Sequence, residues 1–509
     1  MLKATKGLAA LLCLILSSFS QIIPLQQSSL SNRSTVIAKP AGLTNQAIPP
    51  NIIFFLTDDL DAQSISFMPN LMTLLVKEGT SFSNFFTGLS VCCPSRATIL
   101  RGQYAHNHGI LANKPPNGGF LKFRDNQLES STIATWLQSA GYETVLIGKY
   151  LNGYPDNNPL YIPVGWNEWY SRVSSEKVSP GNDPNEDTVP RYFNYKLNEN
   201  GRIVSYGNNP EEYLTDVEGQ KALDFLQRAA GKNKPFFMYL SVNAPHKPEI
   251  PAPRHRNAFR EVKTSPRTAA FNEQDVSDKP SWIRNLPLLN SKQIKRMDRV
   301  YRRRLQMLLS VDELLGNLIN RLTTTGQLAN TYIFFTSDNG YHLGQHRLLR
   351  GKTTLYEEDV HVPMIVRGPD VRAGQLVEEL AGNVDLAPTF AELANITTPS
   401  FVDGRSLLPL LKNGSNSLAK WRESFLLERF FPIESQGKGL HTRVYKYVEY
   451  TNGERELYDL KKDPQELNNV FPQTDRALIN ELSVRLRRLS NCKGVDCRSA
   501  EEEPLLADR

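Results

Sequence analysis

The sequence has few cysteines, few long apolar runs and little net charge, and each of these features excludes some classes of protein. After an apolar run near the start, no other run approaches the length of a membrane-spanning helix, which argues against a membrane span in the mature chain. The net charge of +6 is modest for 509 residues, and no recognisable nucleic-acid-binding module is present. We therefore expect a chain that binds no nucleic acid and does not cross a membrane.

The five cysteines fall into three groups. Cys13 lies in the N-terminal apolar run. Cys492 and Cys497 enclose a short loop, so a disulfide between them is expected, and the lack of a second pair argues against a zinc site. Cys92 and Cys93 are adjacent, and neighbouring cysteines rarely bridge without strain, so chemistry is the better explanation for at least one of them.

The first 20 residues have the layout of a signal peptide. Lys3 and Lys6 precede an apolar run over 8–16, and small and polar residues follow it. An uncleaved anchor is the alternative. Residues 21–49 are rich in Ser, Gln, Asn and Pro and are expected to form a disordered arm. The protein is thus expected to be exported, as a secreted, periplasmic or lysosomal protein.

Length and composition favour one large α/β domain with a smaller one beside it. Apolar runs predict buried strands of the parallel type at 51–56, 144–147, 235–242, 331–336 and 363–366. Amphipathic patterns predict helices at 69–79, 132–141 and 213–230. Short Tyr-rich strands at 424–428, 442–450 and 456–459 and a helix at 474–489 predict an α+β subdomain. The expected organisation is a catalytic domain over 50–415, a subdomain over 420–498 and a loose acidic tail over 499–509.

Four predicted strands run into polar or charged side chains. These side chains are, in chain order, Asp58 with Asp59, Lys149, His246, and Asp338 with Asn339. Ligands of open α/β sheets bind at the carboxyl ends of strands, so we expect these groups to converge on an active site. Each group taken singly has an ordinary alternative, such as a solvated loop acid, a core histidine or a surface lysine.

The converging groups are of two chemical kinds. The acids and the asparagine offer only oxygen donors, which select a hard cation, Ca²⁺ or Mg²⁺. The other groups supply positive charge and proton donors, which suits an anion with several oxygens, such as a sulfate or phosphate ester. This second set comprises Arg96, Lys149, His246 and Lys352.

One stretch organises the chain, the run Val-Cys-Cys-Pro-Ser-Arg-Ala-Thr-Ile-Leu-Arg-Gly over 91–102. A purely structural interpretation has Ser95 cap a helix whose first turn covers 97–100. That interpretation does not require a Cys and an Arg at fixed places. The core of the run, Cys-x-Pro-Ser-Arg followed by Leu-x-Gly, resembles the signature of the type I sulfatases, in which the first Cys is oxidised to formylglycine (3-oxoalanine). Here that residue is Cys92.

The resemblance covers about 50–498 and implies an alkaline-phosphatase-like α/β fold with a smaller C-terminal subdomain. It implies that Cys92 is modified by a formylglycine-generating enzyme. It also implies a Ca²⁺ site, with Mg²⁺ as the lesser choice, and catalytic roles for Cys92, Arg96, Lys149, His246 and Lys352. The implied metal ligands are Asp58, Asp59, Cys92, Asp338 and Asn339, and the implied substrate-binding residues are Lys149, Asn152, His246, His342 and Lys352.

Two positions depart from the family pattern. Many sulfatases have Gly-Lys-Trp-His where this chain has Gly-Lys-Tyr-Leu over 148–151, so a His that often assists the formylglycine is missing, and Asn152 is expected to stand near its place. Arg101 replaces the usual Thr before the signature Gly. In its other motifs the chain looks most similar to the glucosamine-6-sulfatase and extracellular heparan-sulfatase branch.

The function that the resemblance implies is release of inorganic sulfate from a sulfated sugar or an aryl sulfate. One hydroxyl of the hydrated aldehyde would attack sulfur, and the second would expel sulfate. The alternatives are a phosphonate or phosphate monoester hydrolase on the same fold and a non-catalytic, exported glycan-binding protein.

Two further stretches have two interpretations each. Trp166 and Trp169 lie in a polar, Asn- and Pro-rich region where exposed aromatic rings could stack on sugars, although packing of an irregular insert is the more common role. A basic stretch over 292–304 has apolar positions at helical spacing. It predicts a surface helix with a solvated basic face, and a docking face for a sulfated polymer is the alternative.

Overall fold

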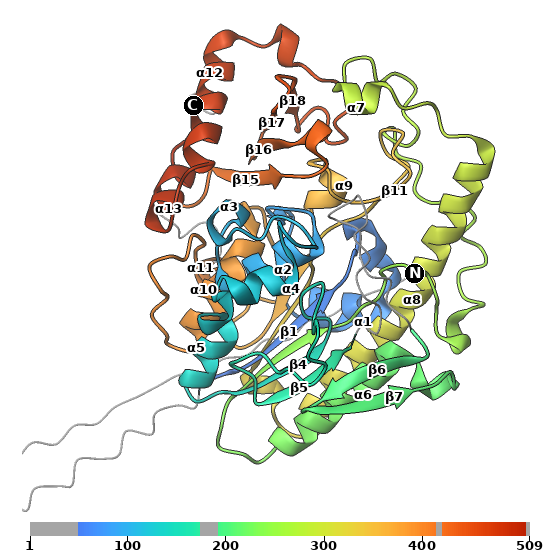
Figure 1. The fold of residues 1–509 in the computed structure, drawn as a ribbon, viewed down its shortest axis with the longest axis vertical. Helices are drawn as coiled ribbons and strands as arrows, with labels where there is room; N and C mark the ends of the chain where they lie inside the picture. Colours follow the sequence, from blue (N-terminus) through green and yellow to red (C-terminus); the bar gives the residue numbers. More distant parts are fainter. Residues whose placement is uncertain (1–48, 174–191, 414–419, 505–509) are drawn as a thin grey trace, which may run out of the picture. The chain divides into compact units, whose positions relative to one another are not determined.

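The computed structural model describes residues 49–173, 192–413 and 420–504. A ten-stranded sheet with the order β13-β2-β12-β9-β1-β8-β4-β5-β6-β7 forms its centre (Figure 1). Its central strands β9, β1, β8, β4 and β5 are parallel, whereas β12, β6 and β7 join as antiparallel neighbours. The strands are β1 (Asn51–Thr57), β2 (Thr80–Phe82), β4 (Glu143–Gly148), β5 (Glu168–Arg172), β6 (Tyr195–Glu199), β7 (Arg202–Tyr206), β8 (Phe236–Ser241), β9 (Thr331–Ser337), β12 (Met364–Arg367) and β13 (Gln375–Val377).

Helices cover both faces of this sheet, which is why its central strands are continuous apolar runs. In β1, Ile53 and Phe55 pack into one hydrophobic cluster, and Phe54 and Leu56 point to the opposite face and pack into another. Residues of α6 (Leu214–Ala229) and α8 (Ser291–Thr324) contribute to the first cluster, and residues of α2 (Cys92–Arg101), α5 (Ile133–Ser139) and α10 (Leu386–Leu393) contribute to the second.

The remaining α-helices and strands before residue 414 are short. They are α1 (Pro69–Leu71), a π-helical turn (Met72–Val76), β3 (Phe85–Phe86), α3 (Ala105–His108), α4 (Gly119–Asp125), α7 (Ser281–Arg284), β10 (His342–Leu343), β11 (Arg350–Gly351), α9 (Glu357–Val360), β14 (Ala381–Gly382) and α11 (Leu408–Asn413). The helix predicted over 69–79 is thus one α-helical turn followed by a π-helical one. No helix in the described ranges is long and apolar enough to cross a membrane. The predicted signal peptide, and the predicted arm except its last residue, lie outside the described residues.

A four-stranded antiparallel sheet forms the C-terminal part (orange to red in Figure 1). Its strands are β15 (Ser424–Arg429), β16 (Gly437–Thr442), β17 (Tyr445–Tyr450) and β18 (Arg455–Asp459), and α12 (Arg476–Leu489) follows them. The strand predicted at 442–450 is present as β17 but begins at Tyr445, because the chain turns after Thr442, the last residue of the unpredicted strand β16. Gly437 and Gly439 lower the strand propensity of this segment, which is why β16 was not predicted. Glycine is needed at 437 because a Cβ there would meet the backbone oxygen of Glu449 at 2.8 Å.

The region expected to be an irregular insert contributes strands to the main sheet instead. β5, β6 and β7 extend it beyond β4. Trp166 and Trp169 are 7% and 0% exposed, and the indole N–H of Trp169 donates to the hydroxyl of Tyr154 at 2.7 Å. Stacking of these two rings on a sugar is therefore excluded, since both are packed inside the protein.

The acidic tail predicted over 499–509 is also wrong in its first residues. Helix α13 (Val495–Glu501) contains Cys497, which forms a disulfide with Cys492, and Glu501 at the end of this helix is 0% exposed. The carboxylate of Glu501 pairs with Arg422 at 2.8 Å, and Arg422 also forms two hydrogen bonds to Asp385, at 2.5 and 2.8 Å. The buried guanidinium of Arg422 thus joins helix α13, which carries Glu501, to the segment that carries Asp385.

Removing Arg422 is expected to destabilise the protein strongly. Arg422→Ala leaves the buried carboxylate of Asp385 without its cation and leaves Glu501 with only Arg405, at 3.0 Å, and this costs about 3–5 kcal/mol in the free energy of unfolding. Arg443 is the matched control, since its pair with Glu423 at 2.9 Å is solvent-exposed, and Arg443→Ala should cost less than about 1 kcal/mol. Denaturant unfolding of both variants measures the difference, and equal losses would contradict the assigned role of Arg422.

Candidate active site

The active-site candidate lies where the carboxyl ends of β1, β4, β8 and β9 meet the N-terminus of α2. The structure brings together nine of the predicted residues there: Asp58, Asp59, Cys92, Arg96, Lys149, His246, Asp338, Asn339 and Lys352. Seven of them are at most 2% exposed, and the side chains of Lys149 and Lys352 are 14% and 7% exposed. Parallel pairing of the four strands accounts for this convergence.

Helix α2 begins at Cys92 itself, with Val91 as its N-cap, and ends at Gly102 in a left-handed conformation. The interpretation in which Ser95 caps the helix is therefore wrong. Ser95 lies within the first turns and its hydroxyl donates to the backbone oxygen of Asp338 at 2.5 Å. All ten residues of the helix are buried. The result is a rigid helix that presents residue 92 at its positive end, where the helix dipole favours a negative charge.

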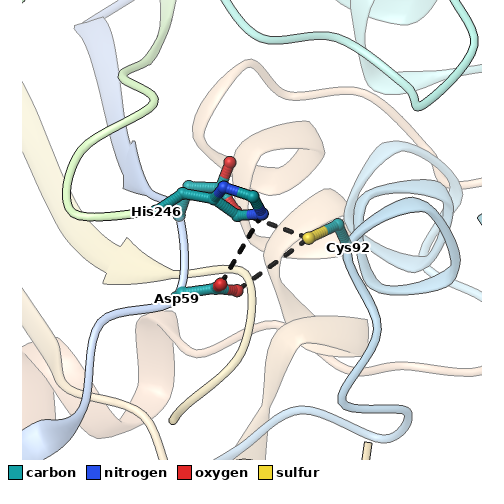
Figure 2. A group of neighbouring side chains, drawn as sticks. Asp59, Cys92 and His246 are labelled. Carbon is teal, nitrogen blue, oxygen red and sulfur yellow. Dashed lines mark hydrogen bonds and ion pairs between the residues drawn. The ribbon is translucent and has the colours of Figure 1, made fainter. Parts of the chain in front are cut away.

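The thiol of Cys92 lies among charged groups (Figure 2). Its sulfur is 3.4 Å from Asp58 Oδ1, 4.0 Å from Asp59 Oδ1 and 2.6 Å from Lys352 Nζ. Figure 2 shows Asp59, Cys92 and His246 pointing toward one another from three different segments. One potential ligand atom from each of these three residues and from Asp58 lies within 4.8 Å of the others.

The oxygen donors in this cluster fit a hard cation. Asn339 donates through Nδ2 to Asp59 Oδ1 at 2.7 Å, and its Oδ1 is buried with no hydrogen-bond partner among the described residues. An orphaned carbonyl oxygen beside carboxylates is what an ion with oxygen ligands would satisfy. Asp58, Asp59, Asp338 and Asn339 therefore fit Ca²⁺ or Mg²⁺ by the chemistry of their donors.

Fixed cations are paired with the three aspartates. Lys149 Nζ is 2.7 Å from Asp58 Oδ2, and Lys352 Nζ is 2.5 Å from Asp59 Oδ1. Burial raises the pKa of Asp58, but the charges of Lys149, His246, Arg96 and Lys352 outweigh it and hold that pKa well below its usual range. Because three carboxylates face two lysines and an arginine, a bound divalent ion would leave the site positive and ready for an anionic ester.

Arg96 ties the signature helix to the metal-type ligands. Its Nε donates to Asp338 Oδ2 at 2.8 Å, and its Nη1 donates to the hydroxyl of Ser241 at 2.6 Å and the carbonyl of Lys149 at 2.9 Å. Burial lowers the pKa of Arg96, but Asp338 and Asp58 outweigh it and raise that pKa above its ordinary value. Burial and the charge of Asp58 raise the pKa of Asp338. Arg96 therefore keeps a permanent charge that favours ionised Asp338.

Sequence reasoning missed Arg304, which the basic stretch over 292–304 had assigned to a solvated face. Arg304 is 1% exposed, donates to the backbone oxygens of Asp59 and Pro245, and lies over the ring of Tyr341 at 4.1 Å. The signal was available, because residue 304 is four positions from both Val300 and Leu308 and so lies on the apolar face of α8. Arg304 buttresses the backbone that carries Asp59.

The two remaining predicted substrate-binding residues, His342 and Asn152, have surroundings of their own. His342 Nδ1 is 2.8 Å from Asp359 Oδ1. Burial raises the pKa of Asp359, but His342 and two hydrogen bonds from Thr354 outweigh this effect, so the pKa of Asp359 is lowered overall. Asn152 lies in the turn after β4, where its backbone oxygen accepts the N–H of Phe120 at 2.7 Å. Asp359 had not been predicted from the sequence.

Cys93 occupies a different environment from its neighbour, although the two are adjacent. It is fully buried in the hydrophobic cluster on the α2 side of the sheet, its N–H donates to Asn113 Oδ1 at 2.9 Å, and burial raises the pKa of its thiol to about 12. A thiol with that pKa remains protonated at neutral pH and is a poor nucleophile. Cys93 is therefore part of the packing.

Replacing Cys93 with alanine is expected to leave catalysis largely intact. Cys93→Ala removes one buried sulfur, so the expected cost is about 1–2 kcal/mol of unfolding free energy, by analogy with small core truncations. The value of kcat, normalised to the fraction of residue 92 that is modified, should stay within about threefold of wild type, a change of about 0.7 kcal/mol in the barrier. A loss beyond a hundredfold in fully modified protein would contradict a packing role.

The parallel sheet, the helix that presents Cys92 and the carboxylates that fit a hard cation define a hydrolase of the alkaline-phosphatase-like class. Comparison with known proteins agrees. A family model described as Sulfatase matches residues 50–396, and a model described as N-sulphoglucosamine sulphohydrolase, C-terminal, matches residues 344–492.

Individual relatives span most of the chain. The N-acetylglucosamine-6-sulfatase of Homo sapiens is 35% identical over 501 residues, covering 88% of this chain and 86% of that protein. The N-acetylglucosamine-6-O-sulfatase of Bacteroides thetaiotaomicron is 31% identical and covers 94% of each. A solved structure of a protein in complex with its substrate D-glucosamine-2-N,6-O-disulfate matches with a TM-score of 0.70 and 28% identity, covering 89% of this chain and 100% of that one. The chain belongs to the sulfatase family, as its Cys-x-Pro-Ser-Arg signature predicted, and it is a sulfuric ester hydrolase.

Proposed function

We propose that this sulfatase removes the 6-O-sulfate group from a glucosamine residue, using residue 92 as formylglycine and a divalent cation. The observation that carries the chemistry is the position of Cys92, whose sulfur lies within hydrogen-bond distance of both Lys352 and Asp58 at the end of a buried sheet. The substrate class is supported by the relatives named above and by the sulfated glucosamine bound in the similar solved structure.

The proposal requires two groups, a divalent cation and a formylglycine at position 92. Asp58, Asp59, Asp338 and Asn339 would hold Ca²⁺, which polarises sulfate oxygens as a Lewis acid. Formylglycine at position 92 would supply, as its hydrate, one hydroxyl for attack on sulfur and a second for release of sulfate. Modification of Cys92 requires a formylglycine-generating enzyme, which we propose as a partner during export.

The side chains around residue 92 would bind and orient the sulfate group. Lys149 and Lys352 place ammonium groups beside the carboxylates and can donate hydrogen bonds to sulfate oxygens. Arg96 holds Asp338 and keeps the start of α2 in register with the sheet. The positive charge of this set stabilises the charge that builds up on the sulfuryl oxygens during transfer.

His246 is the best-placed proton donor for the leaving oxygen. Its Nδ1 is 2.7 Å from the backbone oxygen of Lys247, which makes Nδ1 the protonated nitrogen, and its Nε2 lies 3.7 Å from Asp59 Oδ2. When Nε2 also carries a proton, the imidazolium can donate it to the sugar oxygen as the S–O bond breaks. Lys352 is the alternative donor, since its ammonium is 2.6 Å from the sulfur of Cys92.

A substrate panel tests the proposal directly. Purified protein whose residue 92 is shown by mass spectrometry to be formylglycine is incubated with N-acetylglucosamine 6-sulfate, glucosamine-2-N,6-O-disulfate, an aryl sulfate, an aryl phosphate and an aryl phosphonate. Release of inorganic sulfate from the 6-O position, with the 2-N-sulfate retained, is the expected result.

The other outcomes separate the competing functions. Turnover of the aryl sulfate with no reaction on any sulfated saccharide would indicate a general arylsulfatase. Faster turnover of the phosphate or phosphonate would indicate a phosphonate or phosphate monoester hydrolase. Binding of saccharides without turnover by fully modified protein would indicate a glycan-binding protein.

A further inference from the structure

A second group of metal-type ligands lies outside the cluster around Cys92. It is formed where the loop after β10 meets helix α9 and the loop after β18, and its members are His346, Glu358 and Glu466. One potential ligand atom from each of the three residues lies within 4.8 Å of the others. His346 is 0% exposed and Glu466 is 1% exposed, so the group is built into the protein rather than scattered on its surface.

The ring of His346 is held in one orientation. Its Nδ1 is 2.7 Å from Glu273 Oε2, and the ring stacks on Tyr356 with centroids 4.2 Å apart. Its Nε2 is buried and has no hydrogen-bond partner among the described residues. Metal-binding histidines in proteins usually have this arrangement, with one ring nitrogen on a carboxylate and the other left for the ion. Because Nδ1 is occupied, Nε2 is the nitrogen that can face Glu358 and Glu466.

Several carboxylates lie close together around this group. Lys446 Nζ lies 2.7 Å from Glu466 Oε1 and 3.0 Å from Glu357 Oε1, and the other oxygen of Glu466 accepts the N–H of Glu357 at 2.8 Å. Lys446 is therefore shared by Glu357 and Glu466, and His441 Nε2 lies 3.0 Å from Glu357 Oε1. Glu358 adds a further carboxylate to the group. A divalent ion would add positive charge between Glu358 and Glu466.

One member of this group, Glu358, lines a cavity. A cavity of about 510 Å³ is lined by Glu357 and Glu358, and by Gln345 and Gln465, the chain neighbours of His346 and Glu466. Glu358 is itself partly exposed. The cavity therefore opens onto one of the three ligands, which a buried core cluster would not do.

We propose that His346, Glu358 and Glu466 bind a second divalent cation, a transition metal of the Zn²⁺ type. An imidazole nitrogen with two carboxylates suits Zn²⁺, whereas the oxygen-only ligands near Cys92 suit Ca²⁺. The ion would be structural. It would join three segments, the loop between His342 and Lys352, helix α9, and the C-terminal part that carries Glu466, and so hold the loop that brings Lys352 to Cys92.

Metal titration of the full-length protein tests this site. The protein is treated with a chelator, dialysed, and given excess Ca²⁺ so that the oxygen-only site is filled, and ZnCl₂ is then titrated by calorimetry. Wild type is expected to bind one equivalent of Zn²⁺. His346→Gln and Glu466→Gln are each expected to lose it, and His255→Gln serves as the matched control for loss of an imidazole paired with a carboxylate, since His255 Nε2 lies 3.1 Å from Glu313 elsewhere in the chain.

Two further measurements keep the result decisive. Glu466→Gln retains an oxygen that can accept the N–H of Glu357, so it is expected to fold, and its melting temperature without Zn²⁺ should stay close to that of wild type while the increase on adding Zn²⁺ disappears. Co²⁺ in place of Zn²⁺ should give a visible absorption band in wild type and in Asp338→Asn, but not in His346→Gln. Absence of Zn²⁺ binding in Ca²⁺-loaded wild type would overturn the proposal. Binding that survives both His346→Gln and Glu466→Gln but is lost in Asp338→Asn would place Zn²⁺ in the oxygen-only site and would also overturn it.

Discussion

Cys92→Ser is expected to give an enzyme that reacts once with its substrate and then stalls. If residue 92 stays serine, its hydroxyl can attack sulfur, because Lys352 and the carboxylates around it remain in place. The bond from the serine Oγ to sulfur forms, the bond from sulfur to the sugar oxygen breaks, and the serine proton leaves with the sugar. No second hydroxyl is then present to expel sulfate. Turnover should fall by about 10⁴-fold to 10⁶-fold, the range seen when a nucleophile is removed.

Mass spectrometry of the peptide that contains residue 92 measures this outcome. After incubation with substrate, Cys92→Ser should carry a sulfate ester on residue 92, whereas Cys92→Ala should show neither turnover nor adduct. Cys93→Ser is the matched control, since it makes the same chemical change one residue away in a packed environment and should retain turnover. Repeated turnover by Cys92→Ser, with residue 92 verified as unmodified serine, would rule out the diol mechanism.

Asp338→Ala is expected to abolish activity in a way that added Ca²⁺ does not rescue. The substitution removes an oxygen ligand and also the 2.8 Å partner of Arg96, so it leaves a buried guanidinium without its main carboxylate. We expect kcat to fall by about 10³-fold or more, or about 4 kcal/mol in the barrier. Treatment of wild type with a chelator should have a similar effect, because the carboxylates of Asp58 and Asp59 would then repel each other.

Calorimetric Ca²⁺ binding together with activity in added Ca²⁺ measures both effects. Wild type should regain activity when Ca²⁺ is returned, whereas Asp338→Ala should not. Asp312 is a matched control, since it is a buried aspartate that accepts the backbone N–H of Leu71 at 2.8 Å, and Asp312→Ala should lower stability while leaving kcat and Ca²⁺ affinity unchanged. Full activity of wild type in excess chelator would exclude a catalytic metal ion.

The unmodified thiol of Cys92 already has the surroundings that a reacting group at this position would need. Lys352 joins it to Asp59, and Asp58 joins it to Lys149, so each lysine pairs with a carboxylate that also contacts the thiol. In the proposed function, sulfate oxygens would take over these lysine contacts once a cation is bound to the carboxylates. Charges already held in place would then lower the reorganisation needed during reaction.

The chemistry of the site, and the edge of the sheet on which it lies, could be predicted from the order of residues along the chain. Continuous apolar runs identified the central strands, and the charged residues within four positions after each run, namely Asp58, Lys149, His246 and Asp338, were predicted to lie together. This inference succeeded because parallel strands end at the same edge, so their sequence order implies proximity in space. The disulfide between Cys492 and Cys497 could likewise be predicted from the short spacing of the two residues.

The contacts that bury charged and aromatic groups, by contrast, are seen only in the three-dimensional fold. Glu501 in an acidic end and Trp169 in a polar region have local sequences that indicate exposure, yet each is at most 1% exposed. Arg304 is buried to the same degree, and its helical spacing indicates the apolar face of α8 but not its partners. The partners of these three residues are, in the same order, Arg422, Tyr154 and Asp59, of which the first is 79 positions away and the third 245. A charge can be buried only where an opposite charge or a hydrogen-bond partner lies next to it. The fold, not the local sequence, decides which residues far apart in the chain form these contacts.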